Sequence, residues 1–193
     1  MQPPFGPAIG IFEIGSLARG YALMDLILKK APVKILEGTF MTPGKFFILF
    51  NGDEASVGES FKEVHAAAKP SILDSIEILN LEPRVLPGLY GLLNTQVEHS
   101  LAVIETASMS SGLLAADRSL KEANVDLIEI RSSRGIGGKC LFFVTGKLEE
   151  AQAAVSAAET ILSSRGTLLH TEVIANPHED FLSQFNISGA ANA

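Results

Sequence analysis

The pattern of apolar and polar positions at the start of the chain predicts a strand followed by an amphipathic helix. Residues 8–14 form an apolar, β-rich run that is typical of a buried strand. Leu17, Tyr21, Met24 and Leu28 then recur near helical spacing, which gives the following segment one apolar face. The strand and the helix together form the opening of a compact α/β module.

The remainder of the first half predicts two more strands, a second helix and a closing strand. The expected strands are residues 33–40, 45–50 and 71–81, and the second helix runs from about 53 to 69. The order βαββαβ is that of a ferredoxin-like module, an α/β (α+β) fold in which two helices pack on one antiparallel sheet. The other face of that sheet has no helix, and we expect the linker, the tails or a sister module to cover it.

The second half of the chain repeats the first. With a shift of 92 residues, five residues of the first half meet identical residues of the second: Glu13 and Glu105, Ser16 and Ser108, Gly20 and Gly112, Asp25 and Asp117, Lys29 and Lys121. After a two-residue insertion the offset becomes 94, so that Gly44-Lys45 meets Gly138-Lys139 and Pro83 meets Pro177. Because the matches keep one order and need one small gap, we infer a tandem duplication.

The duplication divides the chain into two modules of one fold. We expect a first module at residues 1–92, a linker at 93–99, a second module at 100–185 and a flexible tail at 186–193. The elements expected in the second module are strands at 101–106, 125–131, 139–145 and 167–175 and helices at 109–123 and 148–163. The linker is too short to let the two modules move independently.

Composition and charge narrow the possible functions. The chain has 193 residues, of which 47% are hydrophobic and 19% charged, as expected for a compact protein with a large buried surface. The formal net charge of -7 disfavours nucleic-acid binding through a basic surface. No apolar run approaches the length of a membrane span and no secretory signal is visible at the start. The single cysteine excludes an intrachain disulfide, so we expect a reducing cytosol.

A glycine-rich segment at residues 135–139 superficially resembles a phosphate-binding loop. Such a loop needs a glycine five positions before the Gly-Lys pair, where Ser133 stands, and a Ser or Thr after the lysine, where Cys140 stands. It also leads into a helix, whereas this segment leads into a predicted strand. We therefore interpret it as a hairpin loop, in which glycine lets the backbone approach a symmetry axis closely.

The remaining reactive side chains form no catalytic constellation. Cys140 shares a predicted strand face with Phe142 and Val144, which indicates a buried and unreactive thiol, although a single cysteine could hold a metal shared between subunits. Four histidines are scattered without a pair at metal-ligand spacing: His65, His99, His170 and His178. Glu13 and Glu105 end the first strand of each module, and their duplication favours a structural role over acid–base catalysis. We expect no enzymatic activity.

Several of these repeated residues resemble the bacterial microcompartment shell domain. The resemblance rests on residues 104–106, 116–117, 121–125, 137–139 and 173–178 in the second module, and on residues 12–13, 18–20, 25, 29–31 and 43–45 in the first. Two such domains in one chain resemble the tandem-domain shell proteins, most closely those of propanediol-utilising compartments, through residues 16–20, 43–46 and 135–140. Together the matches cover nearly the whole chain.

The resemblance implies a structural shell protein of a microcompartment in the bacterial cytoplasm. It implies a homotrimer whose six domains form a pseudo-hexameric tile, which packs with other shell proteins around a central pore for small-molecule metabolites. It implies neither a nucleic-acid nor a membrane partner. The residues that match the pore loops are Met41, Thr42, Pro43, Gly44, Arg134, Gly135, Ile136 and Gly137. Lys29, Lys121 and Asn124 match the tile edge, although the two lysines would also stabilise the C-terminal end of a helix.

One departure from the family pattern concerns a cofactor. In the propanediol type, a cysteine just before the Pro-Gly-Lys turn holds an iron–sulfur cluster on the three-fold axis, and Thr42 stands there in this sequence. Cys140 matches a different cysteine that is not a ligand. We therefore expect no cofactor and no metal, and a polar pore approached by three Thr42 hydroxyls.

Two other classes of function stay open at the level of the sequence. The first is an electron-conducting shell protein with a metal or iron–sulfur centre on the trimer axis. The second is a regulatory ferredoxin-like protein that binds a metabolite between its modules.

Overall fold

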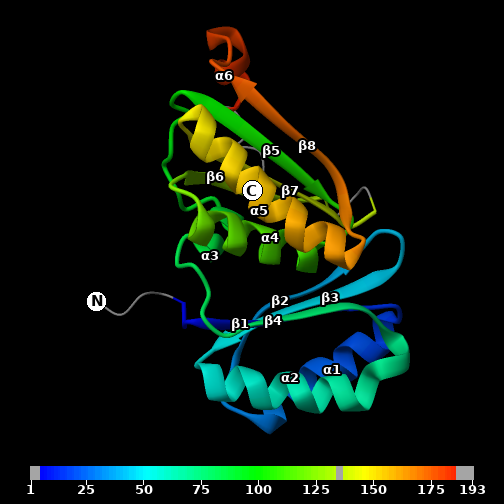
Figure 1. The fold of residues 1–193 in the computed structure, drawn as a ribbon. Helices are drawn as coiled ribbons and strands as arrows, with labels where there is room; N and C mark the ends of the chain where they lie inside the picture. Colours follow the sequence, from blue (N-terminus) through cyan, green and yellow to red (C-terminus); the bar gives the residue numbers. More distant parts are fainter. Residues whose placement is uncertain (1–4, 134–136, 186–193) are drawn as a thin grey trace.

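The computed structural model describes residues 5–133 and 137–185, which fold into two α/β modules that lie one on the other (Figure 1). The elements of the first module are β1 (Ala8–Ile14), α1 (Leu17–Lys30), β2 (Lys34–Met41), β3 (Lys45–Gly52), α2 (Glu54–Ala68), the 3-10 turn η1 (Lys69–Ser71) and β4 (Ile72–Ile78). The short helix α3 (Val85–Leu89) lies in the connection to the second module. The expected flexible tail at 186–193 lies outside the described residues.

The second module repeats the same order of elements. They are β5 (Ser100–Thr106), α4 (Met109–Glu122), β6 (Asp126–Ser133), β7 (Lys139–Gly146), α5 (Leu148–Arg165) and β8 (Leu168–Ala175), followed by α6 (Glu179–Phe185). The two sheets have the orders β2-β3-β1-β4 and β6-β7-β5-β8, and all their strand pairs are antiparallel. The predicted tandem duplication of a ferredoxin-like βαββαβ module is therefore confirmed.

The register of the strands corrects one part of the repeat. Glu13 pairs with Asp74 in the first sheet, and Glu105 pairs with His170 in the second, so the closing strands correspond at an offset of 96. The predicted match of Pro83 with Pro177, which uses an offset of 94, is wrong. The reason is that the segment from the start of α5 to the residue before β8, 148–167, is two residues longer than the equivalent segment 54–71 of the first module, so the offset grows from 94 to 96.

The helices begin and end where local chemistry favours it. The Ser16 hydroxyl accepts a hydrogen bond from Arg19 N at the start of α1, and Ser108 does the same for Ser111 N at the start of α4. Gly166, with a φ of 66°, closes α5 in the left-handed conformation that glycine adopts without strain. The same capping residue therefore opens the first helix of each module.

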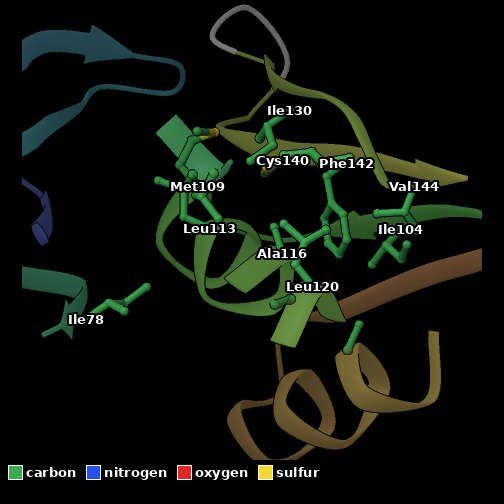
Figure 2. Close-up of a cluster of buried hydrophobic side chains, with 14 of the residues drawn as sticks. Ile78, Ile104, Met109, Leu113, Ala116, Leu120, Ile130, Cys140, Phe142 and Val144 are labelled. Carbon is green, nitrogen blue, oxygen red and sulfur yellow. The ribbon is translucent and has the colours of Figure 1, made fainter. Parts of the chain in front are cut away.

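The first sheet has a hydrophobic core on each of its faces. Its own helices α1 and α2 cover one face, and the core there includes Phe12, Phe46 and Phe50. The opposite face belongs to a second and larger core, which joins Ile11 and Ile78 of the first module to residues of α4 and the second sheet. Figure 2 shows part of this core, with Ile78 pointing toward α4 from the first module. The sister module thus covers the face that the first module leaves without a helix, as expected.

None of the helices in the described part of the chain is long and apolar enough to cross a membrane.

Candidate functional site

Two hairpins from different modules meet on one side of the molecule. The β2–β3 hairpin turns at Thr42-Pro43-Gly44, and the β6–β7 connection returns through Gly137 and Gly138 (Figure 1). Gly44, Gly137 and Gly138 have φ values of 98°, 77° and 72°, in the left-handed region that favours glycine. A Cβ added at Gly138 would lie 3.2 Å from Met41 Cε and 3.6 Å from Thr42 O. The two loops therefore lie next to each other.

The predicted pore residues divide into three groups. Thr42, Pro43, Gly44 and Gly137 are exposed, whereas the Met41 side chain is buried. The rest of the predicted set, Arg134, Gly135 and Ile136, lies outside the described residues. The described part of the set is thus brought together at one place because the two hairpins lie next to each other.

The first helices run away from these hairpins. Ile14, the last residue of β1, pairs with Phe46 beside the β2–β3 turn, so α1 begins on the hairpin side of its module. In the second module Thr106 pairs with Cys140, and α4 begins on the same side. At 14 residues each, the helices carry the chain about 20 Å away from the hairpins.

The predicted edge residues therefore lie at the end remote from the hairpins, in two different settings. The Lys29 side chain is 72% exposed and its Nζ lies 2.5 Å from Asp25. The Lys121 side chain is 31% exposed, and it donates to the Asn80 carbonyl oxygen of the first module and to Asp117. Asn124 is exposed and its backbone N–H donates to Glu150. Equivalent lysines thus lie on a free surface in one module and at the module junction in the other.

A buried ion pair lies at the junction between the modules, next to the hairpins. The Glu13 side chain is fully buried, and its Oε2 lies 3.2 Å from Lys45 Nζ. Its Oε1 accepts hydrogen bonds of 3.1 Å from both the backbone N–H and the hydroxyl of Ser110, in the first turn of α4. A buried carboxylate needs such partners, and the positive end of the α4 dipole adds to them. Glu13 therefore ties the first sheet to the second module, which confirms the expected structural role of this glutamate.

A second polar cluster joins the modules along β4. One oxygen of Asp74 accepts from the Ser108 hydroxyl at 2.6 Å and from the Ser111 hydroxyl at 3.2 Å. The other lies 2.6 Å from Arg165 Nη2, and Arg165 Nε also donates to Ser111. The end of α5 and the start of α4 are thus held on the first sheet by one carboxylate.

The second module has an ion pair equivalent to Glu13–Lys45, but no helix N-terminus covers it within the described residues. Glu105 Oε1 lies 2.7 Å from Lys139 Nζ, and both side chains are partly exposed. The first module has a helix N-terminus over this place, whereas the second module presents its pair at the surface. The repeated sequence has produced one closed and one open copy of the same polar site.

Cys140 is buried in the second core, as its strand pattern predicts. Its side chain is fully buried with Phe142 and Val144 in the same cluster (Figure 2). Burial raises the pKa of the Cys140 thiol far above its ordinary value, and the negative charge of Glu13 acts in the same direction. A thiol in this environment is protonated and inaccessible to a ligand. Within residues 5–133 and 137–185, no group of three or more His, Cys, Asp and Glu side chains has the arrangement of a metal site.

Comparison with known proteins gives one consistent result. The BMC domain family model matches the chain twice, at residues 8–81 and 100–177. The bacterial microcompartment shell protein PduT of Citrobacter freundii is 34% identical over 177 residues, which are 92% of this chain and 96% of that protein.

Solved structures agree with the sequence matches. A microcompartment protein from Desulfitobacterium hafniense DCB has a TM-score of 0.81 and 37% identity, and the match covers 92% of this chain and 98% of that one. A fused permuted hexameric shell protein from the RMM microcompartment has a TM-score of 0.61 and 21% identity over 81% of both chains, and this likeness concerns the fold.

Proposed function

This chain belongs to the BMC domain family and is a structural protein of a bacterial microcompartment shell, and from that premise we propose that three copies close into one pseudo-hexagonal tile with a central pore. Proteins of this family assemble with other shell proteins into oligomeric tiles. The family and the burial of Cys140 favour this structural role over an electron-conducting or a regulatory one.

The single observation that carries the trimeric tile is the way in which the modules are joined. The second module contacts the first through a heterologous junction, in which α4 of one module covers the sheet of the other. A heterologous contact that is repeated generates a closed ring when its rotation permits. With two modules in each chain, three chains supply the six positions of a hexagon.

We assign the pore to the two hairpins that meet at Gly138 and Met41. Their tips, including Thr42 and Gly137, are exposed on the hairpin side of both modules. Since α1 and α4 carry the chain outward from this side, the hairpins are suited to the centre of a disc. We propose that small polar metabolites pass there, with Thr42 as the polar lining and the buried Met41 as the support behind it.

The residues at the opposite ends of the helices are suited to contacts between tiles. Lys29, Lys121 and Asn124 all lie at or just beyond the C-terminal end of α1 or α4, about a helix length from the hairpins. We propose that these residues form the tile edge. Lys121 then has a double role, because it also donates to Asn80 within the chain.

A cross-linking experiment tests the position of the hairpins. Three copies of Thr42→Cys, in a Cys140→Ser background, would surround the three-fold axis, so a trifunctional maleimide with flexible arms should give covalent trimers on a denaturing gel. Lys62→Cys, on the exposed side of α2, is the matched control and should give at most dimers by chance collision. Failure of Thr42→Cys to give trimers above this control would contradict the proposed pore.

A further inference from the structure

One position on the outward face of the sheets changes its chemistry between the two modules. Glu13 pairs with Asp74 in the first sheet and Glu105 pairs with His170 in the second, so Asp74 and His170 are counterparts. A carboxylate is thus exchanged for an imidazole, the side chain whose charge ordinarily changes between about pH 5 and 8.

The contacts of Asp74 show what the junction requires of a side chain at this place. One of its oxygens accepts from the hydroxyls of Ser108 and Ser111, at 2.6 and 3.2 Å. The other lies 2.6 Å from Arg165 Nη2. The second module therefore presents hydrogen-bond donors, a guanidinium and the positive end of the α4 dipole here. Such surroundings favour a hydrogen-bond acceptor and disfavour a cation.

His170 has different surroundings within its own chain. Its Nε2 lies 2.9 Å from Glu172 Oε1, and the two side chains are 68% and 64% exposed. Its partner across β5, Glu105, is paired with Lys139 at 2.7 Å. A proton added to the imidazole would turn its contact with Glu172 into an ion pair in water. The dissociated chain thus accommodates the charged ring and the neutral ring alike.

The proposed ring repeats the junction between chains, which sets the start of α1 of a neighbouring copy at this place. The counterparts of Ser108 and Ser111 are then Ser16 and Arg19 of that copy. The Ser16 hydroxyl accepts from Arg19 N, as the Ser108 hydroxyl accepts from Ser111 N, which leaves the hydroxyl proton for an acceptor on the facing sheet. Lys69 stands at the end of α2, where the second module has Arg165 at the end of α5.

We propose that His170 makes the contact between chains sensitive to pH, with the neutral imidazole accepting from Ser16 of the neighbouring copy and the imidazolium weakening the contact. The inference rests on the proposed trimer and adds its regulation. An imidazolium carries two N–H donors and no acceptor. It therefore loses the Ser16 hydroxyl and faces the positive end of a helix dipole instead.

The charged groups around the imidazole in the ring come from both chains. Its own chain supplies Glu172 from β8 and the pair of Glu105 with Lys139 from β5 and β7. The neighbouring copy supplies Arg19 from α1 and Lys69 from the end of α2. Glu105 is already paired, so Glu172 alone stands against two cations and a helix N-terminus. The proton is therefore bound more weakly in the ring than in the dissociated chain, and acid favours dissociation.

The exchange of Asp74 for His170 confines this response to the contacts between chains. The junction within the chain has a carboxylate at the equivalent place, held by Ser108, Ser111 and Arg165. As the pH falls, the chains should therefore separate before the two modules of one chain do.

Sedimentation velocity of the full-length protein at about pH 8 and about pH 5.5 tests the proposal. The concentration at which the wild-type trimer dissociates should be higher at the lower pH by about tenfold or more, since each contact releases a constraint on one proton. His170→Gln and His170→Asp accept hydrogen bonds without titrating as histidine does, and both should lose most of this response. His65→Gln, at an exposed position of α2, is the matched control and should keep it.

The reciprocal substitution tests the same chemistry inside one chain. Asp74→His places the imidazole against Ser108 and Arg165, and Asp74→Asn is its non-titrating control. In urea unfolding at low protein concentration, the unfolding equilibrium constant of Asp74→His should rise by up to about tenfold per pH unit below about pH 6.5, beyond any change in Asp74→Asn. Equal responses of the two variants would show that this place tolerates an imidazolium, which overturns the proposal.

The outcomes separate this inference from the proposed tile. If the wild type is a trimer with the same dissociation concentration at both pH values, or if His170→Gln and His170→Asp keep the full response, pH sensing by His170 is wrong while the tile stands. If the wild type is a monomer even at about pH 8, where histidine is neutral, the proposed trimer is wrong and the inference is wrong with it.

Discussion

The two modules share a fold and a strand order but differ in which of their surfaces is closed. In the first, every residue of β1 is buried, because α1 and α2 cover one face of the sheet and α4 covers the other. In the second, Val103 and Glu105 of the equivalent strand β5 keep exposed surface. The difference arises because the second module packs on the sheet of the first, whereas within the described residues no further module packs on the sheet of the second.

The covalent attachment of the two modules lowers the entropic cost of forming their contact. A contact between two modules of one chain forms without the loss of translational and rotational freedom that association of separate chains requires. Half of the contacts in the proposed ring are of this kind. Each half-chain is then free to change the residues of its own contact: Glu13 accepts from Ser110 of the second module, whereas its counterpart Glu105 pairs with Lys139 and keeps exposed surface.

The comparison is tested most strongly by one leucine in each module. Leu120 is 5% exposed and Leu28, at the equivalent place, is 52% exposed. We expect Leu120→Ala to lower the free energy of unfolding by about 3 kcal/mol, because it leaves a cavity, and Leu28→Ala to lower it by less than about 1 kcal/mol in the dissociated chain. Urea unfolding followed by circular dichroism at low protein concentration measures both. Equal losses would contradict the proposed inequality of the two helix faces.

The two equivalent ion pairs give the next largest difference. Lys45→Met leaves the Glu13 carboxylate buried with only the Ser110 donors, and we expect a loss of about 2–3 kcal/mol in unfolding free energy. Lys139→Met removes a partly exposed pair, and in the dissociated chain the loss should stay below about 1 kcal/mol. Urea unfolding of the dissociated chain measures both losses. If Lys139→Met lowers the unfolding free energy as much as Lys45→Met, Glu105 is buried within the single chain and the proposed difference between the two ion pairs is wrong.

These differences mark the boundary of what the sequence can predict. The duplication, the order of elements and the Ser16 and Ser108 caps follow from repeated residues and local periodicity. The contacts of Glu13 with Ser110 and of Asp74 with Arg165 span more than 90 residues, and no periodicity encodes them. A signal was nevertheless present, since the first turn of α4 has the small polar residues Ser110 and Ser111 where α1 has Ala18 and Arg19.

The offset of the closing strands was missed for a related reason. Proline matches suggested an offset of 94, but two extra residues between the start of α5 and β8 change the offset to 96. An insertion of this size is invisible when only identical residues are aligned. The correct register makes Glu172 the counterpart of Ile76, so the outward face of the second sheet has a carboxylate where that of the first has an aliphatic side chain.

Cys140 gives a smaller and pH-dependent effect. Its pKa in the folded chain is raised far above the unfolded value by burial, so the folded state holds the thiol proton more tightly. This contribution to stability is complete below the unfolded pKa of about 8.5 and is lost as the pH rises above it, by up to about 1.4 kcal/mol per pH unit. The unfolding free energy of the wild type should therefore fall more steeply above pH 8.5 than that of Cys140→Ala. Parallel slopes for the two proteins would contradict the burial of the thiol.

The smallest expected effect on stability comes from the exposed edge lysine. Lys29→Ala removes a surface pair with Asp25 and should change the unfolding free energy by less than about 0.5 kcal/mol. If Lys29 forms the tile edge, the variant should nevertheless form trimers that pack poorly into sheets, as seen by negative-stain electron microscopy. Lys62→Ala serves as the surface control. Normal sheets from Lys29→Ala would remove this lysine from the proposed edge.

The central claim is that the open face of the second module is closed by the first module of a neighbouring chain, three chains to a ring. Sedimentation equilibrium of the wild-type protein at micromolar concentration tests it most directly. The account predicts a single species of about three times 20.5 kDa. A stable monomer, or a dimer that does not convert to a larger species with concentration, would contradict it.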